Sequence, residues 1–444
     1  MQTKKGLLSH PPRVLVGGFL VVILIGTVLL TLPVSSAAGH ATDFLTALFT
    51  ATSAVCVTGL VVVDTGTYWS TFGQLVIISL IQVGGLGFMT MAVMFWLLLG
   101  HRVTFQERML IQESLNVIEL SGLIRLAKQV IALTLIIELT AALLLALRFV
   151  PELGLARGIG YSLFHAISAF NNAGFDLFGN FRSLTGYVDA PLVNITVTGT
   201  VILGSLGFTV MADLLRYRER KKLSLHTKLV LLVTVILLLL GMSVFLMLEY
   251  NNTLAGLSAG GKFWASWFQA VTPRTAGFNT VDVAAMRPAT LFFIMILMFI
   301  GASPGSTGGG IKTTTFGILC LAVISLARGK EDAEIFNRRI PKEQIYKGMG
   351  VVFLALCWVV FATLLLDVTE KADFLKIMFE VVSAIATVGL SAGLTAGLSA
   401  AGKIIIIITM FLGRLGPLTI AFALAVRQKR KQKYRYPEER VIIG

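Results

Sequence analysis

The stretch Phe49–Gly59, which reads FTATSAVCVTG, recurs in three further copies along the chain and decides the fold. Each copy starts with a phenylalanine, continues as a short apolar segment and ends in a small polar turn around a glycine. The glycine follows the phenylalanine by 10 residues in three copies and by 9 in the other. Four such turns in one chain could surround a single axis and coordinate one ion with backbone carbonyls. The other copies are FHAISAFNNAG (Phe164–Gly174), FQAVTPRTAG (Phe268–Gly277) and FEVVSAIATVG (Phe379–Gly389).

The composition places the chain in a lipid bilayer. Hydrophobic residues make up 56% of the 444 residues and charged residues only 14%, whereas soluble proteins carry about a quarter charged residues. The three cysteines, Cys56, Cys320 and Cys357, give neither a disulfide framework nor metal-ligand spacing. No nucleophile, carboxylate pair or metal set is clustered in the apolar segments. The sequence therefore predicts a membrane protein that is not an enzyme and has no organic cofactor.

The net charge of +14 is distributed unevenly along the chain. The termini and one set of loops hold 26 of the 37 Lys and Arg residues, and the alternate loops hold 9. The remaining two, Lys312 and Arg414, lie within apolar stretches. This asymmetry is the positive-inside signature, so we expect a multi-pass protein of the cell membrane with both termini cytoplasmic. It also argues against nucleic acid as a partner. The basic segments 216–222 and 427–440 would instead bind anionic lipid or an acidic partner protein.

Eight apolar runs are long enough to cross a bilayer as helices, and they fall into pairs that each bracket one glycine phrase. The sequence therefore predicts an all-α polytopic membrane protein with four tandem repeats around a pseudo-fourfold pore. Each repeat consists of a span, a pore helix, a filter turn and a second span. The expected spans are roughly 14–32, 74–99, 130–147, 192–215, 229–248, 289–326, 349–366 and 403–426. The expected repeats are 1–100, 101–215, 216–330 with an intramembrane gate loop, and 331–426, followed by a cytoplasmic basic tail at 427–444.

Four half-length apolar segments, near 42–53, 158–169, 260–271 and 372–383, are too short to cross the membrane. We interpret them as re-entrant helices, which are tolerated in a membrane only inside protein or beside a water-filled cavity. Their C-terminal ends carry partial negative charge and would favour a cation between them. The alternative is four amphipathic surface helices, which would leave the matching glycine turns unexplained.

The glycine turns contain no Asp or Glu, which argues against a filter built from a ring of carboxylates. Potassium selectivity needs carbonyl oxygens that replace the hydration shell, and glycine permits the backbone conformations that aim them inward. We expect potassium at the backbone carbonyls of Thr58, Asn172, Thr275 and Thr387. The predicted filter residues are Val57, Thr58, Gly59, Asn172, Ala173, Gly174, Thr275, Ala276, Gly277, Thr387, Val388 and Gly389.

A glycine-rich break interrupts the sixth apolar run between Gly301 and Lys312. Its glycines and Pro304 cannot sustain a helix, so the segment must line a cavity or lie within protein. The segment resembles a phosphate-binding loop, but Ile311 is inserted before the lysine and no strand precedes it. We expect the segment to lie just below the filter, with the buried charge of Arg414 against it; its role as a gate is implied by the family resemblance given below. The predicted gate residues are Gly305, Ser306, Thr307, Gly308, Gly309, Gly310, Lys312 and Arg414.

The phrase resembles a degenerate potassium-channel signature in which only the central glycine is shared by all four copies. Over nearly its whole length the chain resembles the Trk/Ktr/HKT superfamily, and most closely the KtrB-type membrane subunits of bacterial Ktr potassium uptake systems. The resemblance implies potassium uptake, a gate at Gly305–Lys312, a homodimer, and a cytosolic ring of nucleotide-binding KtrA-type subunits. It also implies a sodium requirement in many members. The order Val57-Thr58-Gly59 departs from Thr-Val-Gly, which predicts weaker discrimination against sodium.

Two further features concern acidic residues. The acidic residues Asp64, Asp176 and Asp282 follow three of the turns, where they either attract cations or are ordinary solvated loop charges. Glu138 lies within the third apolar run, and the simplest interpretation is that it pairs between helices. The main functional alternative to a channel-like pore is an alternating-access symporter for potassium and sodium, which would require inverted repeats.

Overall fold

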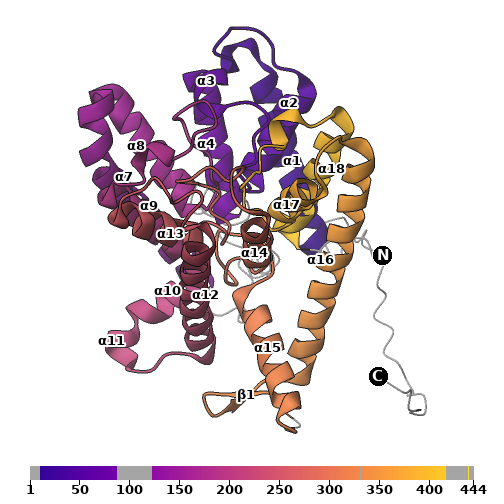
Figure 1. Ribbon diagram of the computed structural model, residues 1–444. Coiled ribbons are helices and arrows are strands. Elements are labelled where there is room, and N and C mark those ends of the chain that lie inside the picture. Colours follow the sequence, from indigo (N-terminus) through magenta and orange to yellow (C-terminus); the bar gives the residue numbers. More distant parts are fainter. Residues whose placement is uncertain (1–10, 88–122, 331, 417–438, 440–444) are drawn as a thin grey trace, which may run out of the picture.

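The computed structural model describes residues 11–87, 123–330, 332–416 and 439. Its helices form four similar groups, here called units 1 to 4, each with a first span, a short helix and a second helix (Figure 1). The first spans are α1 (Pro11–Thr31), α7 (Leu123–Leu153), α12 (Leu225–Glu249) and α16 (Lys342–Thr369). The short helices are α2 (Phe44–Val55), α8 (Leu155–Phe170), α13 (Ala259–Val271) and α17 (Phe374–Ile385). The second helices are α4 (Thr71–Leu86), α9 (Pro191–Leu206), α14 (Pro288–Phe299) and α18 (Ala400–Leu415).

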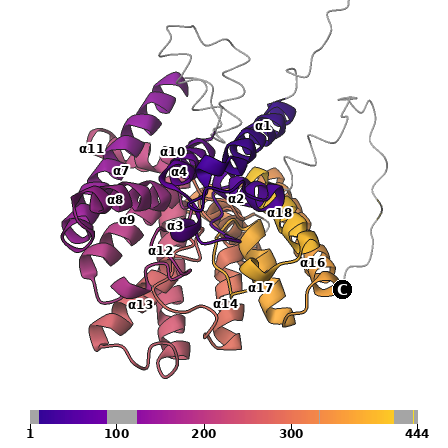
Figure 2. The ribbon, with the colours of Figure 1, turned by 90° about the horizontal axis from the view of Figure 1, so that it is seen from above.

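The units follow one another around a common centre in chain order (Figure 2). The same contact recurs at every junction, because the second helix of each unit packs on the short helix of the next. Helix α4 contacts α8, α9 contacts α13, α14 contacts α17, and α18 contacts α2, which closes the ring. The boundaries expected between the four repeats remain a prediction.

Local sequence signals explain where many helices begin. Asp43 caps α2 by accepting a hydrogen bond from the backbone N–H of Thr46, and Ser70, Ser258 and Ser399 cap α4, α13 and α18 in the same way. Helices α9 and α14 begin with a proline. Proline lacks an N–H, which costs nothing there because the N–H of the first helical residue has no acceptor within the helix.

The second helices are shorter than the sequence predicts. Four of the described helices are long and apolar enough to cross a membrane unbroken, and these are the first spans of the four units. Helices α4, α9 and α18 stop at Gly87, Gly207 and Gly416, whose φ angles of +80°, +94° and +83° a right-handed helix cannot accommodate. After Gly207 the chain turns by 98° into α10 (Phe208–Leu215) and α11 (Tyr217–Arg220). Within the described residues, the helices expected over 74–99, 192–215 and 403–426 therefore end or bend at these glycines.

The sixth run is broken as the sequence predicts. Helix α14 ends at Phe299 and α15 (Thr313–Ala327) begins after a non-helical loop at 300–312. A small antiparallel hairpin of β1 (Glu334–Ile335) and β2 (Arg338–Arg339) follows α15, so the chain is mostly but not purely helical. Short helical turns complete the fold at Pro33–Ser35, α3 (Thr65–Tyr68), Thr185–Tyr187 and Thr395–Gly397. The expected continuations at 88–99 and 417–426 and the basic tail, apart from Glu439, lie outside the described residues.

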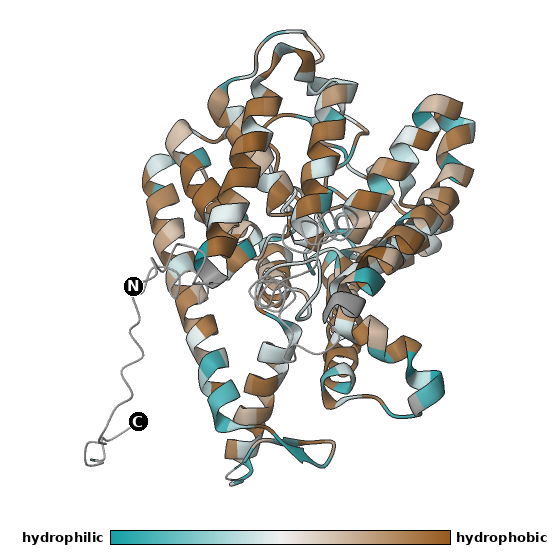
Figure 3. Ribbon diagram, turned by 180° about the vertical axis from the view of Figure 1, so that it is seen from behind, coloured by the Kyte–Doolittle hydropathy of each residue, from teal (hydrophilic) through white to brown (hydrophobic). Residues whose placement is uncertain are grey.

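The surface of the fold suits a bilayer. Large apolar side chains are exposed along the first spans, as at Leu143, Leu239 and Phe353, and most of the helical ribbon has hydrophobic colours (Figure 3). Hydrophilic residues gather at the end that carries α11 and the β hairpin (Figure 3). The short helices lie inside, where their C-terminal halves are almost wholly buried. The fold therefore brings the four glycine turns to the interior.

Candidate functional site

The four glycine turns share one unusual backbone conformation. In each turn the glycine has a φ between 69° and 91°, and the residue two positions before it has a φ between 51° and 69°. The residue between them does not have a positive φ. Alternation between left- and right-handed conformations directs successive N–H groups to one side of the chain and carbonyls to the other. The residues with positive φ are Val57 and Gly59, Asn172 and Gly174, Thr275 and Gly277, and Thr387 and Gly389.

The four turns touch one another in a closed ring. A Cβ atom added at Gly277 would lie 2.6 Å from the carbonyl oxygen of Val388, and one at Gly174 would lie 2.8 Å from Cα of Gly277. A Cβ at Gly389 would overlap the carbonyl of Thr58, and one at Gly59 would overlap that of Ala173. Each glycine therefore faces the turn of a neighbouring unit with no room for a side chain. All twelve residues predicted for the filter belong to this ring.

The register of the turns divides their carbonyl groups into two layers. Thr58 directly precedes its glycine, as Ala173, Ala276 and Val388 precede theirs. Asn172, Thr275 and Thr387 stand one position earlier and share their positive φ with Val57. The carbonyl set Thr58, Asn172, Thr275 and Thr387 therefore combines residues from both layers. The equivalent of the last three in unit 1 is Val57.

A hydroxyl group in, or directly after, each short helix braces the turn that follows, a feature that the sequence analysis missed. The Ser53 hydroxyl accepts a hydrogen bond from the N–H of Gly59 at 3.1 Å, and Ser383 does the same for Gly389. The Ser168 hydroxyl donates to the carbonyl of Phe175 at 2.8 Å, and Thr272 donates to that of Phe278. The signal was present in the sequence, because each of these residues lies four positions after the phenylalanine of its phrase.

Unit 4 has a second brace, which the sequence analysis also missed. Glu380 lies on α17 one turn before Ser383 and is fully buried. Its carboxylate accepts hydrogen bonds from the hydroxyls of Ser391 and Thr395 and from the N–H of Leu394. In unit 2, the equivalent His165 accepts a longer bond from the N–H of Leu177 at 3.4 Å. These contacts fix the chain just beyond the glycines of the two units.

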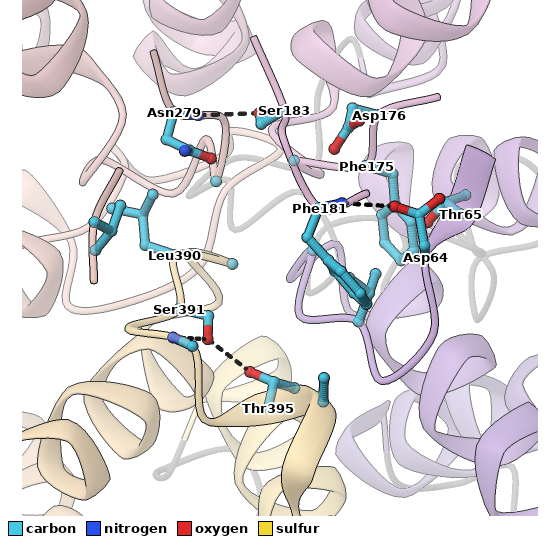
Figure 4. Close-up of a pocket in the computed structure, with 18 of the residues that line it drawn as sticks. Asp64, Thr65, Phe175, Asp176, Phe181, Ser183, Asn279, Leu390, Ser391 and Thr395 are labelled. Atoms are coloured by element: carbon cyan, nitrogen blue, oxygen red, sulfur yellow. Dashed lines mark hydrogen bonds between the residues drawn. The ribbon is translucent and has the colours of Figure 1, made fainter. Parts of the chain in front are cut away.

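A cavity of about 300 Å³ opens on one side of the glycine ring, and all four glycines line it. Asp64, Asp176 and Asp282 also line it, and in Figure 4 Asp64 and Asp176 lie on the opposite side from Thr395. Asp64 accepts a hydrogen bond of 2.7 Å from the N–H of Phe181, which ties unit 1 to unit 2. Burial, together with the nearby Asp64 charge, raises the pKa of Asp176 to about 7. Among the described residues, the cavity wall therefore holds three carboxyl groups and no basic side chain.

The loop at 300–312 lies against the other side of the ring. A Cβ at Gly308 would overlap the hydroxyl of Thr275, and one at Gly309 would overlap that of Thr387. The Thr307 hydroxyl lies 3.1 Å from the carbonyls of both Phe170 and Gly204. The loop thereby contacts the turns or helix ends of units 2, 3 and 4.

Two half-buried cations hold this loop by its carbonyl groups. Lys312 donates to the carbonyl of Gly308 at 2.7 Å. Arg414 donates to the carbonyl of Thr307 and to the carbonyls of Gly84 and Gly85, the last at 3.1 Å. Arg414 of unit 4 therefore joins the loop to unit 1. The structure brings together the residues predicted for the gate, from Gly305 to Lys312 with Arg414.

The chain is similar to known transport proteins over nearly its whole length. The sequence model of the TrkH family, described as a cation transport protein, matches residues 8–434. The chain is 49% identical to the Ktr system potassium uptake protein B of Bacillus subtilis, covering 98% of this chain and 97% of that protein. It is 42% identical to the potassium/sodium uptake protein NtpJ of Enterococcus hirae, covering 98% of this chain and 97% of that protein.

A solved transporter structure has the same fold as this chain. The potassium transporter TrkH from Vibrio parahaemolyticus superposes with a TM-score of 0.70 at 20% sequence identity, covering 93% of this chain and 85% of that one. These relatives are ion transporters, so the expectation that the chain is not an enzyme is confirmed. The chain belongs to the TrkH family of cation transport proteins.

Proposed function

We propose that this chain takes up potassium across the cell membrane through a channel-like pore. The closed ring of four glycine turns, all with the same alternation of φ signs, carries the proposal. Main-chain carbonyls aimed at a common axis would replace the water around a dehydrated potassium ion. The names of the Bacillus subtilis and Enterococcus hirae relatives support potassium as the ion. The short helices would then be pore helices, and the twelve ring residues the selectivity filter.

The surroundings of the ring support a direction of passage. The acidic cavity would be the outer mouth, where negative charge raises the local cation concentration. The cytoplasmic side would be the basic end with α11 and the β hairpin, in agreement with the positive-inside distribution of Lys and Arg. Both termini would then be cytoplasmic.

The loop at 300–312 would be the gate. It occupies the space directly below the Thr275 and Thr387 hydroxyls, and Arg414 and Lys312 hold it there. Shortening Gly305–Gly310 should raise the flux, and Arg414→Ala should raise it as well, because the loop loses its tie to unit 1. An unaltered or reduced flux in a correctly inserted protein would refute the gate.

The name of the Bacillus subtilis relative also supports assembly with other subunits. The basic cytoplasmic end would receive the regulatory ring of KtrA-type nucleotide-binding subunits, and two chains would form a homodimer. The sodium in the name of the Enterococcus hirae relative supports sodium as a second ion.

Ion flux into proteoliposomes tests the proposal. The purified chain should take up rubidium as a potassium substitute down a concentration gradient, with sodium carried more weakly. Conductance well above transporter turnover would support a pore. Saturating uptake with a fixed ratio of sodium to potassium would instead support the alternating-access symporter.

A further inference from the structure

A buried polar cluster lies beside the second glycine turn. It consists of Gln82 on α4, Glu138 on α7 and Asn171 at the end of α8. Glu138 lies midway along the first span of unit 2 and is only 4% exposed. An ionisable side chain at such a depth is costly to insert and usually has a functional partner. Within the described residues, no Lys or Arg forms an ion pair with it.

The three side chains are joined by hydrogen bonds. The Asn171 amide nitrogen Nδ2 lies 3.1 Å from Glu138 Oε1 and 2.8 Å from Gln82 Oε1. The Gln82 amide donates to Glu138 Oε2 at 3.3 Å. Both oxygens of the carboxyl group are thus bonded to amides. The cluster connects three helices from units 1 and 2.

Asn171 links this cluster to the glycine turn. It directly precedes Asn172, which has the positive φ of the turn. The backbone N–H and the side-chain amide of Asn171 both donate to the carbonyl of Ile167 in the last turn of α8. A Cβ at Gly85 would overlap the side-chain oxygen of Asn171, so this side chain also packs on the backbone of α4. Asn171 therefore has little freedom while Glu138 and Gln82 hold its amide.

The same residues are connected to the loop below the ring. Arg414 donates both to the carbonyl of Gly85, against which Asn171 packs, and to the carbonyl of Thr307. The Thr307 hydroxyl in turn lies 3.1 Å from the carbonyl of Phe170, the residue before Asn171. These contacts form a closed network, here called the circuit. It runs from the cluster to Arg414, from Arg414 to the loop, and from the loop back to the end of α8.

The circuit is specific to unit 2. The residues that occupy the position of Asn171 in the other units, three before the glycine, are Cys56, Ala386 and Arg274. Cys56 and Ala386 have no side-chain amide, and the Arg274 side chain has no hydrogen-bond partner within the described residues. In the part of the chain that the structure describes, only the second turn is tied in this way to a carboxyl group within a span.

We propose that Glu138 is a positioning residue that holds Asn171, and thereby keeps the second filter turn and the intramembrane loop in register with each other. Through this contact Glu138 influences both the preference for potassium over sodium and the closure of the gate. The proposal rests on the proposed function, because it assigns Glu138 to the same filter and gate.

The test compares variants of the whole chain in proteoliposomes, using the ratio of rubidium to sodium flux. Glu138→Ala removes the acceptor of Asn171, and Asn171→Ala removes the donor. Each should change the ratio by about two- to tenfold, the range that one net hydrogen bond supplies. The double variant should change it no more than either single one, because both remove the same contact. Glu138→Gln keeps an acceptor oxygen and should restore most of the wild-type ratio.

The matched control is Glu249→Ala. Glu249 is also buried, but it is the last residue of α12, and its partners, Thr290 and the N–H of Arg287, lie at the start of α14. This variant should lower the yield of folded protein without changing the flux ratio. The same outcome for Glu138→Ala, or additive effects of Glu138→Ala and Asn171→Ala, would overturn the proposal. If Glu138→Ala fails to fold, Asn171→Ala tests the same contact from the other side.

The failure of this proposal is distinguishable from that of the proposed function. If the wild-type chain carries rubidium and sodium equally, the filter itself is refuted. If the wild type is selective and both single variants keep its ratio and its gating, only the role of Glu138 is refuted.

Discussion

A methyl group at Gly277 should disrupt the ring of glycine turns. Gly277→Ala places a Cβ atom 2.6 Å from the carbonyl oxygen of Val388 and 3.0 Å from Cα of Gly174. Both neighbours are backbone atoms of other units, so they cannot rotate away as a side chain would. The residue must also keep a φ of +78°, which side chains other than that of glycine disfavour.

Two costs add at this position. A left-handed conformation costs an alanine about 1–2 kcal/mol. Forcing extra atoms into a packed interior costs a further 1–3 kcal/mol, approximately. The total of about 2–5 kcal/mol is comparable to a large part of the stability of a typical protein, so the ring should relax by widening. Wider carbonyl spacing would favour sodium entry with part of its hydration shell and reduce selectivity.

Gly393→Ala is the matched control. Gly393 lies four residues after Gly389 with a φ of +87°, but its nearest neighbour would be Cβ of Ala284 at 3.8 Å. It should suffer only the conformational cost of about 1–2 kcal/mol. Flux ratios for rubidium and sodium in proteoliposomes, with thermal stability in detergent, separate the two effects. If Gly277→Ala and Gly393→Ala lose stability equally and both keep the wild-type flux ratio, the argument from close packing is refuted.

Three further changes have defined expectations. Ser383→Ala should reduce selectivity and cost about 1–3 kcal/mol by leaving a buried N–H unsatisfied, whereas Ser79→Ala, on the exposed side of α4, should change neither flux ratio nor melting temperature. Glu380→Ala removes the acceptor for Thr395 and its neighbours and should cost about 2–5 kcal/mol; a melting temperature equal to that of wild type would contradict this. Raising the pH at the cavity from about 6 to about 8 should increase uptake at low potassium, because Asp176 ionises as the pH passes its pKa of about 7. In Asp176→Asn this increase should disappear, and its persistence would assign the pH dependence to another group.

Helices and turns could be predicted from the sequence where the same residue pattern occurs in several copies. The four phrases place the short helices within a few residues, and the closing glycine of each phrase has the positive φ that the argument required. The break before Lys312 was also predictable, because no helix tolerates that density of glycine and proline.

Features that depend on tertiary packing were not predictable. Gly87, Gly207 and Gly416 end their helices in a left-handed conformation, yet glycines within apolar runs are equally consistent with close helix packing. The contact between Glu138 and Asn171 joins residues 33 positions apart on different helices, and no local pattern reports it.

The contact between α18 and α2 has a consequence for biosynthesis. It joins the last described helix to the second helix of the chain, so the wall of the proposed conduit is complete only after translation has reached the fourth unit. A nascent chain with three units inserted leaves the ring open on one side, and lipid or another membrane protein must cover that side until α17 and α18 arrive. An incomplete ring therefore encloses no passage until the fourth unit is in place.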